Sequence, residues 1–431
     1  MRLSRNFLHD AFTVAVLFLG TGAFLTLAVN PTNSSPRTSA EGNPTMQALW
    51  IAVYVIVAMR ASRNYRQILQ ALRANKLLVL LVLLAILSTF WSEDPYFTLR
   101  RAIALLATTL FAIDLSTRYS LRELLRLVGI ALALPIVLSV VVEIFFHGLL
   151  TPTADSSAWS GVFDHKNVFA KTVVLAATVF LTQTRLALWG AITTMGVVVI
   201  SFVLIGAAQA RTALVVFAVM LLLLPAFRID RESRKAVIPI TIMAALVASC
   251  ILPLTTDLTS FTGLLGRDAT LTGRTAIWAQ SLASVARRPI EGYGYSAFWG
   301  VSSEALRIDS YIGGELNHAH NGYLELTLEL GIVGLALFLV VYAMAVWRAA
   351  RYMNSDAGPG REAIWPLAYF SFILLYQITE NTIVVGNSIF WMLYVSTVCW
   401  VTELARQHSD AVTMQSGVAT DSSFAVQREP V

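Results

Sequence analysis

Long apolar runs dominate this sequence and constrain its fold more than any other feature. About twelve stretches of the chain consist mostly of apolar residues. A helix that crosses a bilayer needs about 20 apolar residues, or fewer where the bilayer thins. Hydrophobic residues make up 56% of the chain and charged residues only 13%, whereas soluble domains carry about 25% charged residues. Too little polar surface remains to cover such a core in water. The pattern excludes a soluble globular protein and predicts an all-α polytopic membrane protein.

The apolar runs are separated by short polar segments, except at one long connection. The predicted spans cover residues 11–29, 46–60, 77–91, 101–115, 123–147, 167–184, 186–206, 212–227, 236–253, 322–347, 363–379 and 387–403. The chain is thus divided into nine spans within 1–253, a loop at 254–321, three spans within 322–403, and a tail at 404–431. Ser, Thr and Gln are frequent in the tail, which predicts disorder there.

Basic residues are distributed unevenly between the two sides that this topology defines. With a cytoplasmic N-terminus, 20 of the 31 Lys and Arg residues lie on the cytoplasmic side. Five of the remaining 11 belong to the long loop, where charge has little influence on orientation. Both termini are therefore predicted to be cytoplasmic and the loop to lie outside. Because the basic residues sit between apolar runs rather than on one water-facing surface, nucleic-acid binding is not expected.

The loop at 254–321 has the composition of an ordered segment, with Gly, Trp and Tyr rather than low complexity. Residues Gly273 to Arg288 predict an amphipathic helix that ends before Pro289. Its apolar face carries Ile277, Trp278, Leu282 and Val285. We expect this helix to lie along the membrane surface.

Polar side chains gather at the outer ends of the predicted spans. The set mixes both charges with amides and imidazoles, and it consists of Glu143, His147, Asp164, His165, Lys166, Asn167, Lys171, Gln209, Arg211, His318, His320, Asn321, Glu325, Glu329, Glu380 and Asn381. A charged group within a span costs about 2.5 to 3.5 kcal/mol, so such groups are usually functional. Snorkelling and capping explain single members, such as Glu143, but explain the mixed cluster poorly. A polar cavity open to the outer face is predicted.

Two groups within this set have both a structural and a functional interpretation. The Asp-His-Lys-Asn run at 164–167 opens the sixth span, where its Asp suits a helix cap and the two following residues suit interface anchors; the residues alone favour this structural role. Arg211 and Arg274 suit a pyrophosphate, because a guanidinium holds phosphate oxygens at two points and keeps its charge. A separate salt bridge for each arginine is an equally good interpretation of the spacing.

A third group is the run His318-Ala319-His320-Asn321-Gly322-Tyr323-Leu324-Glu325, which enters the tenth span. Two histidines so close together are possible metal ligands, but zinc needs further ligands, and no Cys or His pattern supplies them. An imidazole with an ordinary pKa near 6.5 is well suited to remove a hydroxyl proton, and Asn321 and Glu325 are placed to orient it. The residues favour a base over a metal site.

These elements together resemble the O-antigen ligase and polymerase superfamily over about residues 160–345. The resemblance is carried by Arg211, the Gly273-Arg274 turn followed by Trp278, the histidine run, and its continuation Glu329-Leu330-Gly331-Ile332-Val333-Gly334. The His165-Lys166-Asn167 element, after Gly161-Val162-Phe163-Asp164, is similar to exopolysaccharide polymerases of the ExoQ type. Membership would imply a GT-C-like inner-membrane protein with twelve helices and a periplasmic loop that covers the active site.

The resemblance also implies a glycosyltransferase that uses no metal and no other cofactor. It would polymerise oligosaccharide repeats carried on undecaprenyl pyrophosphate, with inversion at the sugar. Arg211 and Arg274 would bind the pyrophosphate, and His320 would be the base for the acceptor hydroxyl. Supporting roles would fall to His318, Asn321, Glu325, His165, Lys166 and Asn167. Sugar rings would stack on Tyr293, Tyr295, Phe298 and Trp299, unless these form an interfacial belt.

The sequence does not identify the acceptor, so related activities stay open. The ExoQ-like element favours a polymerase, with a flippase and a chain-length regulator as partners. An O-antigen ligase, which uses a lipid A core as acceptor, and a protein O-oligosaccharyltransferase are the alternatives. A transporter is disfavoured because no pair of broken helices occupies corresponding halves of the chain.

Overall fold

The computed structural model describes residues 2–23, 44–146, 158–183, 188–228, 270–354 and 361–425. All regular structure in these residues is helical, as predicted. In chain order the helices are α1 (Arg2–Leu19), α4 (Pro44–Arg63), α5 (Tyr65–Ala74), α6 (Lys76–Leu87), η1 (Ser88–Phe90), α7 (Pro95–Arg118), α8 (Leu121–Phe145), α9 (Lys166–Gln183), α10 (Leu188–Ala207), α11 (Arg211–Ala226), α14 (Thr270–Val285), α15 (Phe298–Val301), α16 (Ser303–Ile312), α17 (Gly322–Met353), η2 (Arg361–Ala363), α18 (Ile364–Tyr376) and α19 (Ile389–Ala425).

Several helices have the length and hydropathy of membrane spans. Five qualify singly, namely α4, α7, α8, α10 and α17, and a sixth span is formed if α5 and the α6–η1 segment, bent by 94°, are counted together. Each predicted span among the described residues coincides at least partly with a helix, whereas residues 236–253 lie outside them. A multi-pass membrane protein is confirmed, and the number of twelve crossings stays a prediction.

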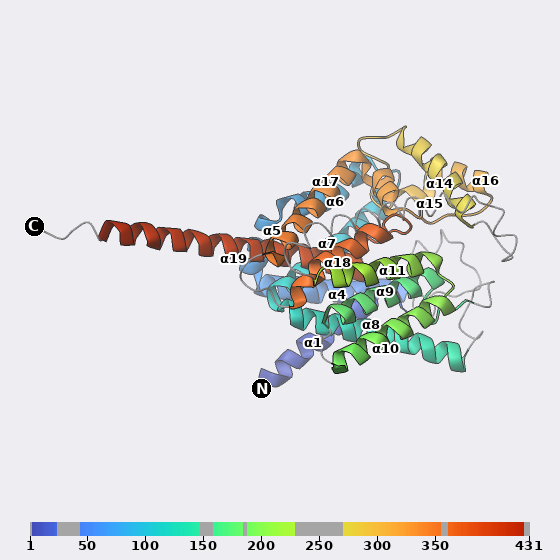
Figure 1. Cartoon of the computed structure of the whole chain (residues 1–431). Coiled ribbons are helices and arrows are strands. Elements are labelled where there is room, and N and C mark those ends of the chain that lie inside the picture. Colours follow the sequence, from blue (N-terminus) through green and yellow to red (C-terminus); the bar gives the residue numbers. More distant parts are fainter. Residues whose placement is uncertain are drawn as a thin grey trace, which may run out of the picture.

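The helix bundle has two ends that differ in their residues (Figure 1). The loop end consists of residues 88–95, 142–146, 158–167, 207–211, 270–325 and 377–388. The basic end consists of residues 60–76, 114–126, 226–228, 348–353 and 402–407. The first and last described residues both lie on the side of the basic end (Figure 1). This arrangement agrees with two termini on the same side of a membrane.

Of the loop predicted at 254–321, residues 270–321 form an ordered unit with its own apolar core, and residues 254–269 lie outside those that the structure describes. Helix α14 packs against α16 and α17. The core consists of Ile277, Tyr293, Phe298, Trp299, Ala305, Ile308, Ala319, Leu324 and Leu328. The predicted apolar face of α14 therefore packs within the protein at Ile277, while Leu282 remains 58% exposed.

The aromatic residues of this unit serve packing, so the expectation that they stack on sugar rings is wrong. Tyr293, Phe298 and Trp299 belong to the core, and the hydroxyl of Tyr295 donates to the carbonyl of Val384. Trp299 is the most exposed of the four, at only 6%. The apolar area that they bury stabilises the loop, and a substrate has no access to it.

Helix α17 is interrupted at Gly331, whose φ of 65° lies in the left-handed region that glycine adopts readily. Segment 289–294 crosses α17 at this break. The amides of Tyr293 and Gly294 donate to the carbonyls just before the break, and the amide just after it donates to Pro289. A Cβ at Gly331 would collide with the backbone of the segment. The glycine of the Gly-Ile-Val-Gly continuation thus joins the loop to the bundle.

The C-terminal tail differs from its prediction. Helix α19 continues beyond residue 404 as far as Ala425, where disorder was expected from 404 onward, and it projects away from the bundle (Figure 1). No proline interrupts this stretch, and Glu403 accepts from Arg406 and Gln407 one turn later. A polar composition weakens burial without preventing a helix. Residues 426–431 lie outside the described residues.

Candidate active site

The two histidines of the predicted site lie in the turn that precedes α17. The side chain of Asn321 caps this helix by accepting from the amides of Tyr323 and Leu324. His320 takes a φ of 51°, which is uncommon for a residue with a Cβ. The sequence His-Ala-His-Asn-Gly therefore ends the loop in a tight turn and starts a helix.

The peptide between the histidines is held on both sides by side chains from neighbouring helices. The amide of Ala319 donates to the Glu325 carboxylate at 2.7 Å, and its carbonyl accepts from Trp278 Nε1 at 2.9 Å. Trp299 Nε1 donates to the same carboxylate at 2.9 Å. Glu325 thus binds the peptide that carries both imidazoles, whereas Asn321 binds the first turn of α17. That either residue orients an imidazole stays a prediction.

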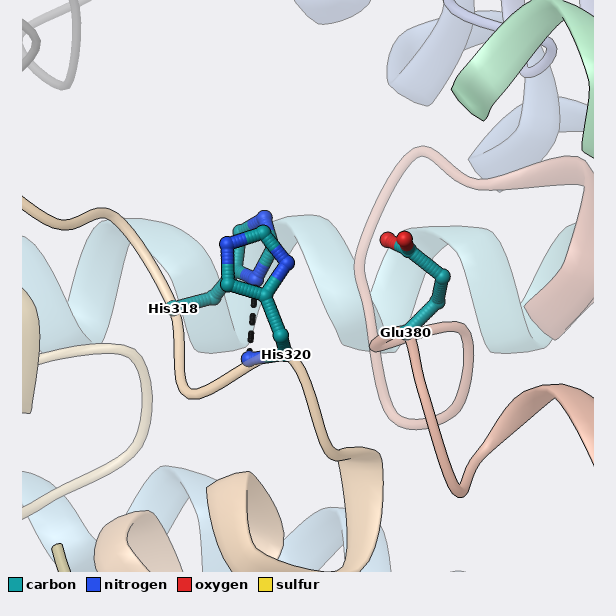
Figure 2. Close-up of side chains that lie close together, drawn as sticks. All are labelled: His318, His320 and Glu380. Atoms are coloured by element: carbon teal, nitrogen blue, oxygen red, sulfur yellow. Dashed lines mark hydrogen bonds between the residues drawn. The ribbon is translucent and has the colours of Figure 1, made fainter. Parts of the chain in front are cut away.

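The two imidazoles lie against each other and face a carboxylate that is one of the polar residues at the outer span ends but is not one of the predicted site residues. Their ring centroids are 4.0 Å apart, and the amide of His320 donates to His318 Nδ1 at 3.2 Å. Glu380, in the segment after α18, points toward them (Figure 2). One ligand atom from each of the three residues lies within 4.8 Å of the other two. We call His318, His320 and Glu380 the histidine–glutamate cluster.

Positively charged and amide groups surround this cluster. Arg274, on α14, pairs with Glu380 at 3.5 Å between Nη2 and Oε1. Asn167, on α9, donates to the same oxygen at 3.1 Å. Lys171, one turn along α9, is buried with its ammonium 4.7 Å from the ring centre of Phe390. Residues from four distant parts of the sequence therefore meet at one point.

Both imidazoles are neutral near pH 7. Burial, together with the charges of Lys171 and Arg274, lowers the pKa of His318 to about 4. Burial and the neighbouring His318 lower the pKa of His320 to about 3, although Glu380 opposes this shift. His320 Nδ1 is buried and has no hydrogen-bond partner among the described residues. A neutral imidazole with an unused nitrogen is able to accept a proton.

Two imidazoles and a carboxylate are also a set that divalent metals accept. The carboxylate is already bound by Arg274 and Asn167, and Lys171 adds another positive charge beside the histidines. The electrostatics favour an anion here, and a metal-free reaction stays a prediction.

The remaining predicted residues lie near the cluster without joining it. His165 is exposed, and its Nδ1 accepts from the amide of Asn167. Lys166 is the first residue of α9. Arg211 is exposed at the start of α11, a helix that packs on α9 and α18. Among the described residues, no hydrogen bond or ion pair links Arg211 to Glu380 or either histidine.

The start of α9 is positioned by a buried residue that capping alone would not explain. The carboxylate of Glu143, on α8, accepts from the amides of Ser160 and Gly161 at 2.9 and 2.7 Å. These contacts fix the segment that leads to Asn167. Glu143 therefore supports the site through the backbone, as Glu325 does.

These features define a class of protein: a multi-pass membrane protein with neutral histidines, a carboxylate and cations at one end of its bundle, beside an ordered loop. Residues 196–339 match a family model described as O-antigen ligase. This match includes Arg211, Arg274, both histidines and the break at Gly331. The resemblance to the O-antigen ligase and polymerase superfamily is thereby confirmed.

The individual proteins that this chain resembles also have names that refer to polysaccharides. The chain is 25% identical over 339 residues to the exopolysaccharide production protein ExoQ of Rhizobium meliloti, with 75% of each chain covered. It is 26% identical over 137 residues to a protein of Rickettsia felis named as a polysaccharide ligase, with 31% of each chain covered. A protein of Rickettsia typhi with a similar name is 39% identical over 70 residues, which is 15% of this chain and 17% of the relative. A polysaccharide polymerase or ligase type of function is supported.

Proposed function

We propose that this protein polymerises oligosaccharide repeats carried on undecaprenyl pyrophosphate, at the outer face of the bacterial inner membrane, with both termini in the cytoplasm. The observation that carries the proposal is the histidine–glutamate cluster beside Arg274, since it combines a neutral base with a cation suited to a diphosphate. The distribution of Lys and Arg supports the orientation.

In the proposed reaction the acceptor hydroxyl attacks the anomeric carbon of the donor sugar from the face opposite the diphosphate. His320 takes the hydroxyl proton as the new C–O bond forms. The bond to the diphosphate breaks, and the diphosphate leaves on its lipid with the electron pair. Arg274 and Arg211 hold the negative charge that grows on the leaving group, so no metal and no acid are required. The configuration at the anomeric carbon is inverted.

The donor itself would activate the base. A diphosphate that binds Arg274 competes with Glu380, whose Oε1 lies 3.5 Å from Nη2 of the guanidinium. Its negative charge also offsets Lys171 and Arg274, two of the charges that lower the pKa of His318. The pKa of each histidine therefore rises toward its ordinary value, where proton transfer is most effective. Glu380 then stabilises the protonated imidazole.

The extent of similarity favours a polymerase over a ligase. ExoQ covers 75% of this chain, whereas the relatives named as ligases cover 31% or less. An O-antigen ligase or a protein O-oligosaccharyltransferase would use the same donor half-site with a different acceptor. A flippase that delivers the repeats and a chain-length regulator are the protein partners that a polymerase requires. A transporter would have no need of the base.

The deciding experiment is transfer by the purified protein in lipid nanodiscs. With lipid-linked repeats alone, we expect polymer and free lipid diphosphate to appear. Product only after a lipid A core or a protein acceptor is added would identify the alternatives, and movement of repeats across vesicles without joining would identify a transporter. Glu380→Gln should keep polymer formation but shift its pH profile, because the carboxylate no longer stabilises the protonated imidazole.

Orientation is tested by labelling a cysteine at Ser310, which is exposed on α16. In a chain whose own Cys250 and Cys399 are replaced by Ala, Ser310→Cys should react in intact spheroplasts with a reagent that cannot cross membranes. Arg122→Cys, at the basic end, should react only after the membrane is broken. The reverse pattern would contradict the proposed topology.

A further inference from the structure

A second polar site lies at the basic end, on the opposite side of the bundle from the histidines. A cavity of about 270 Å³ opens where α5 and α6 meet at their 94° bend. It is lined by Arg73, Ala74, Asn75, Lys76, Leu77, Leu78, Val341, Met344, Arg348 and Val398. The cavity is thus built by α5, α6, α17 and α19, which come from three distant parts of the sequence.

The charged groups of this cavity all have one sign. Arg73, Lys76 and Arg348 line it, and no acidic residue does. Within the part of the chain that the structure describes, none of these three forms an ion pair with a carboxylate, and Arg348 donates only to Thr402 Oγ1, at 2.8 Å. The first turn of α6 also faces the cavity, and the side chain of Asn75 does not cap it. Three cations and the positive end of a helix favour an anion.

The other walls of the cavity are apolar and continue into the outer surface of the bundle. Leu77, Val341 and Met344 are among these walls, and Met344 is 38% exposed. Neighbouring residues Leu80 and Trp347 are exposed on the outer faces of α6 and α17, which are expected to contact lipid. A free phosphate would gain nothing from such walls, whereas a lipid would contact both the cations and the apolar surface.

We propose that this cavity binds the head group of an anionic phospholipid, with its phosphate against Arg73, Lys76 and Arg348 and its chains along α6 and α17. Snorkelling explains single cations at helix ends, but it does not explain a cavity that three of them line. Basic pockets between spanning helices are a recurrent form of lipid head-group site. The volume is slightly below the range of about 300 to 1,000 Å³ for drug-sized ligands, which suits a small head group.

The test measures lipid binding by the purified full-length chain with native mass spectrometry. Phosphatidylglycerol and phosphatidylcholine with the same acyl chains are titrated separately, and we expect the anionic lipid to bind more tightly. The triple variant Arg73→Gln, Lys76→Gln, Arg348→Gln should weaken phosphatidylglycerol binding by about tenfold or more. The matched control replaces three exposed arginines of the same end outside the cavity, Arg63→Gln, Arg122→Gln and Arg126→Gln, and should weaken it less than about twofold.

A second variant keeps every charge and fills the space. Met344→Trp should weaken phosphatidylglycerol binding while leaving the thermal unfolding of the lipid-free protein unchanged. Equal weakening in both triple variants would overturn the proposal in favour of diffuse surface charge. Displacement of the lipid by inorganic phosphate at equal concentration would identify a free anion as the ligand, and unaltered binding by Met344→Trp would exclude the cavity.

Discussion

The loop end and the basic end both collect arginines, but they use them differently. At the loop end Arg274 is only 15% exposed in its side chain and pairs with Glu380 among neutral imidazoles. At the basic end Arg73 and Lys76 are exposed and share their surroundings with further cations. Opposite charges under partial burial interact strongly, whereas exposed charges are screened by solvent. The loop end is therefore suited to chemistry, whereas the basic end is suited to the proposed orientation of the chain and the proposed binding of lipid.

The two ends also differ in what holds the polar groups in place. At the loop end, buried carboxylates bind backbone amides: Glu325 binds the amide of Ala319, and Glu143 binds that of Gly161. The buried carboxylate of the basic end, Asp114, binds side chains instead, namely Arg60 at 2.7 Å and Arg118 at 3.1 Å. A carboxylate that holds a peptide fixes the position of the neighbouring side chains. A buried carboxylate that pairs with an arginine of another helix, as Asp114 of α7 does with Arg60 of α4, joins the two helices instead.

The largest expected effect comes from removing the proposed base. His320→Ala should lower polymer formation by about 100- to 10,000-fold, because a general base contributes that much. His318→Ala should have a smaller effect. Polymer length and lipid-linked precursors are measured on gels, with Arg122→Gln at the basic end as the control. A normal rate of transfer by His320→Ala would remove this residue from the mechanism.

The guanidinium of Arg274 should rank next. Arg274→Lys keeps the charge but loses the planar fork, so we expect transfer to fall by about 10- to 100-fold, the effect of a hydrogen bond to a charged group. The same change at Arg211 tests whether an arginine without contact to the cluster joins it when the donor binds. Arg63→Lys is the matched control at the basic end. Wild-type chain length in the Arg211→Lys, Arg274→Lys double variant would refute the diphosphate assignment.

A smaller effect is expected from the residue that holds the peptide between the histidines. Trp278→Phe removes the Nε1–H donor to the carbonyl of Ala319, which should slow transfer by about two- to tenfold. Trp347→Phe makes the same change on an exposed residue near the basic end and should leave transfer unaltered. A positioning role requires the loss to appear in kcat and in the pH profile. A loss confined to protein yield would indicate a purely structural role.

The smallest effect concerns stability against pH. In the unfolded chain each histidine takes up a proton near pH 6.5, whereas in the folded protein His318 and His320 do so only near pH 4 and pH 3. Stability should therefore fall as the pH drops below 6.5. The change in Tm between pH 7 and pH 5 should be smaller in the His318→Asn, His320→Asn variant than in the unaltered protein.

Local patterns of the sequence predicted the helices and the histidine turn. Apolar composition alone is enough to indicate a span, and Asn321 precedes α17 as a capping residue should. The tail after 404 was misjudged because polar residues without proline are compatible with a helix. Low hydropathy indicates exposure, not the loss of secondary structure.

The sequence alone could not predict which distant residues lie close together in the fold. Glu380 is 60 residues after His320 and belongs to another helix connection, so only the packing of α18 against α9 and α17 brings it to the imidazoles. Its place among the polar residues at outer span ends was the one available indication. The same limit applies to Glu325 and Asn321, since a side chain that binds the backbone has the same sequence pattern as one that binds an imidazole.

Segment 289–294 crosses α17 at its break, and this crossing restricts where residues can be inserted into the chain or deleted from it. Three backbone hydrogen bonds fix the segment against the helix, so one added residue would move Tyr293 out of the core. Gly313 and Gly314, in the turn after α16, have open space around them. Insertions and deletions should therefore accumulate among related sequences at 313–317 and be rejected at 289–294. The length of the loop would then be constant where it crosses α17 and variable in the turn after α16.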